Sequence, residues 1–393
     1  MLDLEKVKGI FKERVNRFVC LVDVGGEIVS AYLPNPGRLW ELLIPGTEVL
    51  LVRSLGGMDY IRESLKSRKH RYVLIATKRF GRWVLLHTHL TNRIVRDLIG
   101  SGRIEFLKGF KVVREEVDIG NRRIDFLLEG DGGRIYLEVK TCTLFGRRIA
   151  MFPDAVTKRG SDHVVELSHL VDRNTKSIVL FVIMNPAVDY FLPTYHIDRE
   201  FAKNMLKFSD LVEFRAISIG FNECLKEVRE VKEVRILWDH LRSVDFDKGV
   251  YLLVIELDRP KVIKVGALGE LPFEKGFYVY VGSAFSGLKG RIGRHKNRNK
   301  KLRWHIDYLT SEAKRVDAIP IVTTEDIEEE LAEKVSSIAD DCILRFGASD
   351  SLLESHLFFF RENPIKNRDF VELVCYYRLD RILGDDLEDS RPF

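Results

Sequence analysis

The chain of 393 residues is long enough for two or three domains. Its composition, 45% hydrophobic and 31% charged, is ordinary for a soluble globular protein. The net charge of +4 is too mild to prove a nucleic-acid partner by itself.

The five cysteines are far apart and form no CxxC pair, so neither a zinc ribbon nor a disulfide framework is indicated. This usage fits a reducing compartment. The N-terminal segment is charged and lacks the apolar core of a signal peptide. No segment approaches the length of a transmembrane helix. We therefore expect a cytoplasmic protein without a membrane partner, and its oligomeric state stays open.

Residues 1–86 are predicted to form an OB-like β-barrel, because short apolar runs alternate there with Gly/Pro turns. We expect this domain to bind nucleic acid. The expected strands are residues 18–24, 27–33, 47–52, 72–77 and 82–88. Turn geometry explains Asn35 and Gly37. It does not explain Arg17 and Arg38, for which we expect phosphate contacts.

The next segment carries a charged triplet in two predicted strands. Asp125 stands between apolar neighbours, and Glu138 and Lys140 lie two positions apart. Side chains alternate along a strand, so Glu138 and Lys140 share one face while Val139 packs into the core. A hairpin register could bring Asp125 beside them. Two carboxylates and an ammonium suit a divalent metal and a group that orients water, which predicts metal-dependent phosphodiester chemistry.

Simpler interpretations exist for the same residues. Asp125 could be a surface acid at a strand end, and Glu138 with Lys140 could form an exposed salt bridge. The apolar flanks of the second strand favour a catalytic site, because unpaired charge is costly in a core strand. A predicted helix at residues 92–110, a helix at 161–171 and a buried strand at 177–184 complete this part of the chain.

Five segments in this order resemble the sugar fermentation stimulation protein A family: RVNRF, LPNPGRLWELLIPG, RIDFLL, LEVKT and FPDAVTKRG. The resemblance runs through about residue 222. It implies an OB-like first half, a PD-(D/E)xK nuclease-like α/β domain at residues 87–222, DNA binding and a metal-dependent nuclease core.

The resemblance also assigns roles. Asp125 and Glu138 would hold Mg²⁺ or Mn²⁺, and Lys140 would orient the water or stabilise the phosphate. Glu116 could be an additional acid. Three residues of the FPDAVTKRG element would border the site: Asp154, Thr157 and Arg159, the last in contact with nucleic acid. His163 could be a general base or a phosphate contact, but a structural or helix-capping role is favoured.

Residues 223–246 are charged and are predicted to form a helical linker. A fresh α/β domain is expected at residues 247–380 and a frayed tail at residues 381–393. Its predicted elements are strands at residues 248–257, 261–266 and 276–284, a basic helix and an acidic helix at 325–335, followed by the apolar segment SHLFFF at 355–360.

Charge is concentrated around the basic helix. No acidic residue lies between Lys275 and Asp307, and a surface with that bias attracts phosphate. The basic residues are Lys289, Arg291, Arg294, Lys296, Arg298, Lys300, Lys301 and Arg303. We expect Arg294, His295 and Lys296 to contact nucleic acid.

An ordered set of motifs resembles the GIY-YIG nuclease superfamily, closest to a prokaryotic branch of unassigned function. The motifs are GVY at 249–251, YVG at 280–282, WHIDYL at 304–309 and SHLF at 355–358.

This second resemblance covers about residues 247–378 and implies a second site. Tyr280 would be the general base or its relay, supported by Tyr251, with a pKa lowered by neighbouring charge. Arg291 would neutralise developing charge, and Glu328 would hold the metal. Ser283 and Ala284 replace a Lys found in many catalytic members, so this domain could bind nucleic acid without cutting it.

The sequence thus supports a DNA-binding, metal-dependent endonuclease with two nuclease-like domains. A regulatory or architectural DNA-binding protein with vestigial sites is the alternative, and an RNA processing factor is a further one. The acid pair in a core strand favours the nuclease, because a pure binder gains nothing from carboxylates that repel phosphate.

Overall fold

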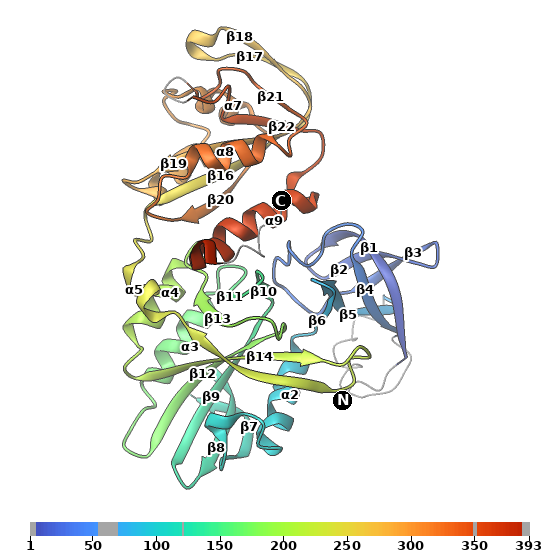
Figure 1. Ribbon diagram of the computed structural model, residues 1–393, viewed down its shortest axis with the longest axis vertical. Helices are drawn as coiled ribbons and strands as arrows, with labels where there is room; N and C mark the ends of the chain where they lie inside the picture. The colour runs from blue at the N-terminus through green and yellow to red at the C-terminus, as the bar shows by residue number, and fades with distance from the viewer. Residues whose placement is uncertain (1–4, 54–69, 120–121, 349–351, 387–393) are drawn as a thin grey trace. The chain divides into compact units, whose positions relative to one another are not determined.

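The computed structural model describes residues 5–53, 70–119, 122–348 and 352–386. The chain divides into two compact units, Met1–Arg242 and Ser243–Phe393. Figure 1 draws the second unit in yellow to red. Within the described ranges, no helix is long and apolar enough to cross a membrane.

The first unit begins with a closed β-barrel. Its strands are β1 (Lys6–Asn16), β2 (Val19–Val24), β3 (Glu27–Tyr32), β4 (Glu48–Arg53), β5 (Tyr72–Arg79) and β6 (Arg82–Leu85). They pair in the order β3-β2-β1-β4-β5-β6, and a further parallel pairing of β3 with β5 closes the first five strands into a barrel. Closure removes exposed sheet edges. The predicted OB-like barrel is confirmed.

The apolar pattern does not predict strand β1, because charged residues interrupt its apolar ones throughout. Inside the barrel this strand places Phe11, which is buried, and Gly9. A Cβ atom on Gly9 would lie 2.5 Å from Cγ1 of Val22, so only glycine lets the two strands approach. Ladders with β2 and β4 hold this charged strand in place.

A nine-stranded mixed sheet follows the barrel in the order β10-β11-β13-β15-β14-β12-β9-β8-β7. Its strands are β7 (Lys111–Ile119), β8 (Arg122–Gly130), β9 (Gly133–Cys142), β10 (Leu144–Phe145), β11 (Ile149–Phe152), β12 (Thr175–Ile183), β13 (Tyr190–Pro193), β14 (Val212–Phe221) and β15 (Val228–Ile236). Strand β9 lies between β8 and β12, so it is a central strand, as its apolar flanks predicted.

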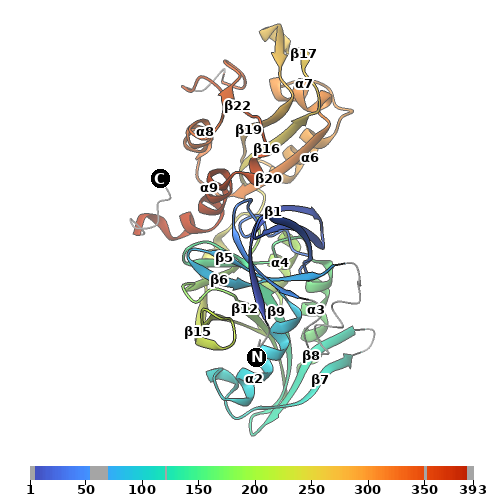
Figure 2. The same cartoon turned by 90° about the vertical axis from the view of Figure 1, so that its right-hand side faces the viewer.

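Helices accompany this sheet, and Figure 2 shows α2 and α3 beside its strands. They are α2 (His89–Gly100), the 3-10 turn η1 (Glu105–Leu107), α3 (Lys158–Ser168) and α4 (Arg199–Lys207). The helix expected at residues 92–110 is therefore shorter and ends at Gly100.

The predicted helical linker at residues 223–246 is wrong. Its central part is strand β15, followed by the short helix α5 (Trp238–Ser243). Valines at positions 228, 231 and 234 imitate helical spacing, but Val228 and Val234 lie on one strand face and are buried. Ladders with β14 and β13 make this charged segment part of the sheet.

The second unit is built on a five-stranded antiparallel sheet in the order β20-β16-β19-β22-β21. Its strands are β16 (Gly249–Leu257), β19 (Gly276–Ala284), β20 (Arg315–Val322), β21 (Asp341–Cys342) and β22 (Leu357–Phe360). Strands β17 (Lys261–Lys264) and β18 (Glu270–Phe273) form a separate pair, so β17 does not continue the β16 ladder as a hairpin.

The helical segments of the second unit follow in chain order. They are η2 (Gly266–Leu268), α6 (Leu288–Lys296), α7 (His305–Glu312), α8 (Glu328–Ser336), η3 (Pro364–Lys366), α9 (Arg368–Arg378) and η4 (Asp380–Asp386). The segment expected to be a frayed tail therefore begins inside η4, and its residues 387–393 lie outside the described part of the chain.

Candidate active sites

Asp125 and Glu138 face each other across strands β8 and β9. Phe126 pairs with Leu137, which places the two acids opposite each other one step further along. The Oδ2 atom of Asp125 accepts a hydrogen bond of 2.7 Å from the backbone N–H of Val139. The Oδ1 atom accepts one of 2.7 Å from Nδ2 of Asn92 on α2. These contacts fix the carboxylate on the face that Glu138 shares.

Glu138 is 3% exposed and is the most buried acid of this group. Its Oε1 atom accepts from Nζ of Lys140 and lies 2.5 Å from Nδ1 of His163. Among the described residues, its buried Oε2 atom has no hydrogen-bond partner. Buried carboxylate oxygens are normally satisfied, so this atom is available to a ligand.

His163 positions Glu138 from helix α3. Nε of Arg159 donates to Nε2 of the ring at 3.3 Å. An arginine can only donate, so Nδ1 carries the proton that is donated to Glu138. The N-cap of α3 is Thr157, whose side chain accepts from the N–H of Gly160. The ring is therefore fixed against Glu138, and it does not cap the helix.

The two carboxyl groups have opposite pKa shifts. Burial, followed by the charge of Glu138, raises the pKa of Asp125 to about 7. Burial alone would also raise the pKa of Glu138, but Lys140 and His163 outweigh it and lower that pKa. Near neutral pH this environment favours one ionised carboxylate, and a bound cation would stabilise the second.

A cavity of about 960 Å³ opens onto this site from the side of the barrel. Its lining combines a few acids with many cationic or amide groups. The charged and amide residues along it include Arg17, Asn92, Arg93, Arg96, Glu116, Asp125, Lys140 and Arg159. Cations around two carboxylates suit an anionic ligand that approaches a metal-binding centre.

The barrel contributes to this cavity through the loop at residues 34–38. The guanidinium of Arg14 donates to the carbonyls of Gly37 at 2.6 Å, Arg38 at 2.8 Å and Arg17 at 2.7 Å. Arg14 is therefore a scaffold for the loop. Arg17 lines the cavity. Arg38 is exposed and stacks near Trp40 rather than lining the cavity.

Glu116, the additional acid suggested by the sequence, borders the cavity. Glu115 pairs with Phe126 and Val117 with Ile124, so Glu116 lies opposite Asp125. Glu116 has a left-handed φ of 53°, and its carboxylate pairs with Arg123 at 3.3 Å. It borders the site without contacting the two central carboxylates.

Asp154 and Thr157 also line the cavity. Burial raises the pKa of Asp154, and hydrogen bonds from the backbone N–H groups of Leu39 and Arg38 lower it only in part. A Cβ atom on Gly37 would collide with its carboxylate. Asp154 thus joins the nine-stranded sheet to the barrel loop, and glycine at position 37 leaves room for it.

The residues present fit a divalent cation. Asp125 and Glu138 supply hard oxygen donors side by side, and one buried oxygen of Glu138 is unsatisfied. No group of three or more His, Cys, Asp or Glu side chains forms a metal cluster within the described ranges. An ion here would therefore depend on water, backbone or substrate oxygens for its remaining ligands.

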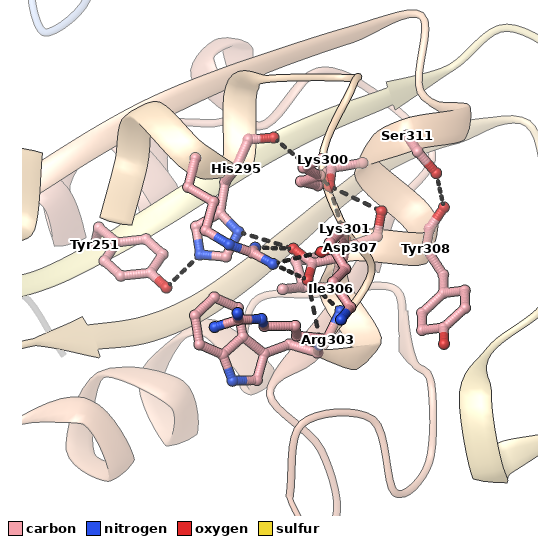
Figure 3. Close-up of polar contacts among 12 residues, drawn as sticks. Tyr251, His295, Lys300, Lys301, Arg303, Ile306, Asp307, Tyr308 and Ser311 are labelled. Carbon is pink, nitrogen blue, oxygen red and sulfur yellow. Dashed lines mark hydrogen bonds and ion pairs between the residues drawn. The ribbon is translucent and has the colours of Figure 1, made fainter. Parts of the chain in front are cut away.

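The second unit holds a buried polar network around Tyr251. Its hydroxyl lies 2.9 Å from Nε2 of His295, and Nδ1 of His295 lies 3.7 Å from Oδ1 of Asp307. Figure 3 shows His295 between Tyr251 and Asp307. Both oxygens of Asp307 also accept from the guanidinium of Arg294, at 2.7 and 2.8 Å.

This network overturns two expected nucleic-acid contacts. His295 is 1% exposed, so it cannot reach a polynucleotide. Arg294 forms a bidentate pair with the fully buried Asp307 and stacks 4.3 Å from the Trp304 ring. The sequence shows that these residues are basic, but it does not show towards which groups their side chains point. Lys296 is exposed and still available to a phosphate.

Tyr251, the residue expected to support the base Tyr280, is a phenol of low acidity. Burial, followed by the charge of Tyr280, raises the pKa of this phenol. Low solvation disfavours the phenolate more than Arg291 favours it. Tyr251 is therefore a neutral hydrogen-bonding partner of His295, which agrees with a supporting role.

The remaining residues of the second motif set come together. The rings of Tyr251 and Tyr280 lie 6.5 Å apart, and a Cβ atom on Gly282 would collide with both. Glycine is thus required in the YVG motif by close packing. Arg291 and Glu328 both act electrostatically on Tyr251, so they belong to the same neighbourhood.

Several residues of these sites carry little local signal. His163 is an exception. It lies at helical spacing with Gly160, Val164 and Leu167 on the buried face of α3, and this spacing could have predicted its burial. Nothing near Asn92 distinguishes it from a surface residue of α2. Asp307 follows Arg294 by 13 positions, and only the fold joins them.

Comparison with known protein families matches all three parts of the chain. The model described as "SfsA N-terminal OB domain" matches residues 13–86, and "Sugar fermentation stimulation protein RE domain" matches residues 89–224. "Domain of unknown function DUF123" matches residues 250–376, and this third domain is GIY-YIG-like. The fold and sites thus define a barrel joined to a nuclease-like α/β domain, followed by a further α/β domain.

Individual relatives specify the family. A sugar fermentation stimulation protein homolog of Methanothermobacter thermautotrophicus is 37% identical over 196 residues, which are 50% of this chain and 78% of the relative. The homolog of Methanosphaera stadtmanae is 39% identical over 200 residues, 50% of this chain and 80% of the relative. The chain belongs to the sugar fermentation stimulation protein family.

A solved structure agrees with this assignment. "The structure of Pyrococcus Furiosus SfsA in complex with Ca2+" has a TM-score of 0.52 and 28% sequence identity. The match covers 59% of this chain and 96% of the Pyrococcus furiosus chain. These relatives leave the second unit largely unmatched, so that unit is an addition to the family's shared core.

Proposed function

We propose that the chain is a DNA-binding nuclease that hydrolyses phosphodiester bonds with Mg²⁺ or Mn²⁺ at the Asp125/Glu138/Lys140 site. The domains at residues 1–86 and 87–222 would act together, because the cavity is lined by both. The observation that carries the proposal is the unsatisfied, buried Oε2 atom of Glu138 opposite Asp125. The relative from Pyrococcus furiosus, solved with Ca²⁺, supports a divalent ion.

Each residue has a physical role in this proposal. Asp125 and Glu138 would hold the ion, which when bound supplies Lewis-acid activation of water and of the phosphoryl group. The Lys140 ammonium, beside Glu138, neutralises charge that develops on phosphate oxygens. His163 keeps Glu138 oriented. Arg17 and Arg159 on the cavity wall attract the backbone phosphates.

The test is a cleavage assay on plasmid, single-stranded DNA and RNA, with and without Mn²⁺. Glu138→Gln or Lys140→Ala should reduce cleavage by at least about 100-fold while DNA binding persists, because the metal or charge-stabilising group is lost. Glu129→Gln is the matched control, since it changes an exposed acid on β8. Undiminished cleavage in both site variants, with Tyr280→Phe also present, would refute the site.

One observation favours a second candidate, a DNA-binding protein without catalysis. Lys140 and His163 already satisfy Oε1 of Glu138, so the site is partly balanced without metal. This candidate predicts Mn²⁺-independent DNA binding and no cleavage of any substrate in the same assay. Cleavage of RNA alone would instead identify an RNA processing factor.

We propose a second nucleic-acid site in the domain at residues 247–380. Tyr280, supported by Tyr251, would activate the attacking water, Arg291 would stabilise the phosphate, and Glu328 would hold a metal. Tyr280, Arg291 and Glu328 all act electrostatically on Tyr251, so the four side chains lie near one another, and this supports the assignment. Tyr280→Phe, compared with Lys140→Ala, would assign any activity to one domain.

A further inference from the structure

His356 is a buried imidazole with no visible hydrogen-bonding role. Its side chain is 2% exposed, and neither Nδ1 nor Nε2 has a hydrogen-bond partner among the described residues. Its backbone is fixed on both sides, by the carbonyl of Phe346 and the N–H of Val281. A buried ring held so firmly with two unsatisfied nitrogens calls for a ligand, such as an ion.

The atom that faces His356 is an acid. Nδ1 of His356 lies 3.4 Å from Oε1 of Glu328. This contact does not qualify as a hydrogen bond. Two ligands bound at about 2.1 Å to one ion lie about 3.0 Å apart in an octahedral arrangement and about 3.4 Å apart in a tetrahedral one. The observed separation is therefore that of two donors prepared for a shared ion.

Other acids near the start of helix α8 are engaged elsewhere. Glu330 accepts from the hydroxyl of Tyr377 and pairs with Arg381. Glu329 accepts from the N–H of Leu352. Glu328 is thus the acid directed at His356, and its side chain is 25% exposed, which leaves a path for an ion.

The surroundings suit a metal that acts on Tyr280. A Cβ atom on Gly347 would lie 3.5 Å from the Tyr280 hydroxyl and 3.4 Å from Cβ of His356. Gly347 has a φ of +71°, which favours glycine, and the two side chains converge beside it. An ion between Glu328 and His356 would therefore lie next to this phenol.

We propose that His356 and Glu328 together bind a divalent transition-metal ion such as Mn²⁺ or Co²⁺. An imidazole nitrogen distinguishes this site from the all-oxygen donors of Asp125 and Glu138, and it disfavours Mg²⁺. The inference rests on the proposed second site and adds to it a ligand and a metal preference. Its test measures binding, so it does not require that the protein cut DNA.

The experiment uses the full chain with Asp125→Asn and Glu138→Gln, so that the first site contributes no metal. Calorimetry with Mn²⁺ should find one ion per chain. His356→Ala and Glu328→Gln, each added to this background, should weaken Mn²⁺ binding at least about 10-fold. The background protein should bind Mg²⁺ more weakly than Mn²⁺.

Two controls keep the result interpretable. Glu329→Gln changes a neighbouring acid and should leave Mn²⁺ binding intact, and circular dichroism should show that each variant is folded. If His356→Ala is misfolded, the partly exposed Glu328→Gln still decides. Failure of Mn²⁺ to bind the background protein, or equal affinity in folded His356→Ala, would overturn the proposal. Absence of DNA cleavage in the wild type would count only against the proposed nuclease.

Discussion

Nδ1 of His163 lies 2.5 Å from Oε1 of Glu138, although 25 positions separate these residues in the chain. Helix α3 brings the imidazole to the central strand β9, where it shares one carboxylate oxygen with Lys140. The contact makes His163 a positioning residue, since it would act on a metal or substrate only through Glu138.

Loss of this contact should change the pH dependence of the proposed cleavage activity. His163→Ala removes one of the two groups that lower the pKa of Glu138. The acidic limb of the cleavage profile should therefore move to higher pH, with activity about 10-fold lower. The measurement is the pH dependence of Mn²⁺-dependent cleavage. His169→Ala, at the exposed end of α3, is the control. Lower stability with an unshifted profile would indicate a purely structural histidine.

Asp125 should make stability depend on pH. Its pKa of about 7 in the folded chain lies above the ordinary 3.8, so the protonated form favours folding. This contribution is complete below about pH 4 and is lost as the pH rises through about 7. Asp125→Asn, which stays neutral, should therefore be more stable than wild type at pH 8, by on the order of 2 kcal/mol.

The measurement is thermal unfolding at pH 4, 6 and 8 in a chelator, so that no metal offsets the repulsion between the acids. The gap in Tm between variant and wild type should grow from pH 4 to pH 8. A gap that is constant with pH would show that Asp125 ionises at its ordinary pKa.

Arg294 and Lys296 should have different effects although they are two positions apart. Arg294→Ala leaves the buried Asp307 without its bidentate partner and should destabilise the second unit by about 3 kcal/mol. Lys296→Ala removes an exposed charge and should leave the free energy of unfolding unchanged.

Denaturant unfolding and DNA binding at several salt concentrations separate these effects. Lys296→Ala should reduce the salt slope by about one if that lysine contacts phosphate. Equal destabilisation by both variants would contradict the buried ion pair. A salt slope unaffected by Lys296→Ala would remove α6 from the nucleic-acid interface.

Arg17 and Arg38 form a second matched pair, on the barrel. Arg17 lines the cavity together with Asp125 and Lys140, whereas Arg38 does not. Arg17→Ala should therefore weaken DNA binding several-fold and lower the salt slope by about one, and Arg38→Ala should do less. Affinity measured across salt concentrations checks this. A larger effect of Arg38→Ala would place the DNA outside the cavity.

Local patterns predicted much of this protein. The barrel strands followed from short apolar runs and turns, and the central position of β9 followed from the residues that flank Glu138. The shared face of Glu138 and Lys140 required only the twofold alternation of a strand. The charge-rich strands β1 and β15 were missed, because their few buried apolar residues give only a weak strand pattern and ladders on both sides complete the hold on them.

The tertiary structure decided which charged groups lie at the candidate sites and which are held in buried ion pairs. Composition marked Arg294 and His295 as part of a basic surface, but the fold directs both towards Tyr251 and Asp307. It also brought Asn92 and His163 to the two carboxylates of the first site. The alternation of a single strand is a short-range property that a sequence displays directly. The partner of a buried charge is chosen by desolvation and by contacts between distant segments, which exist only once the chain has folded.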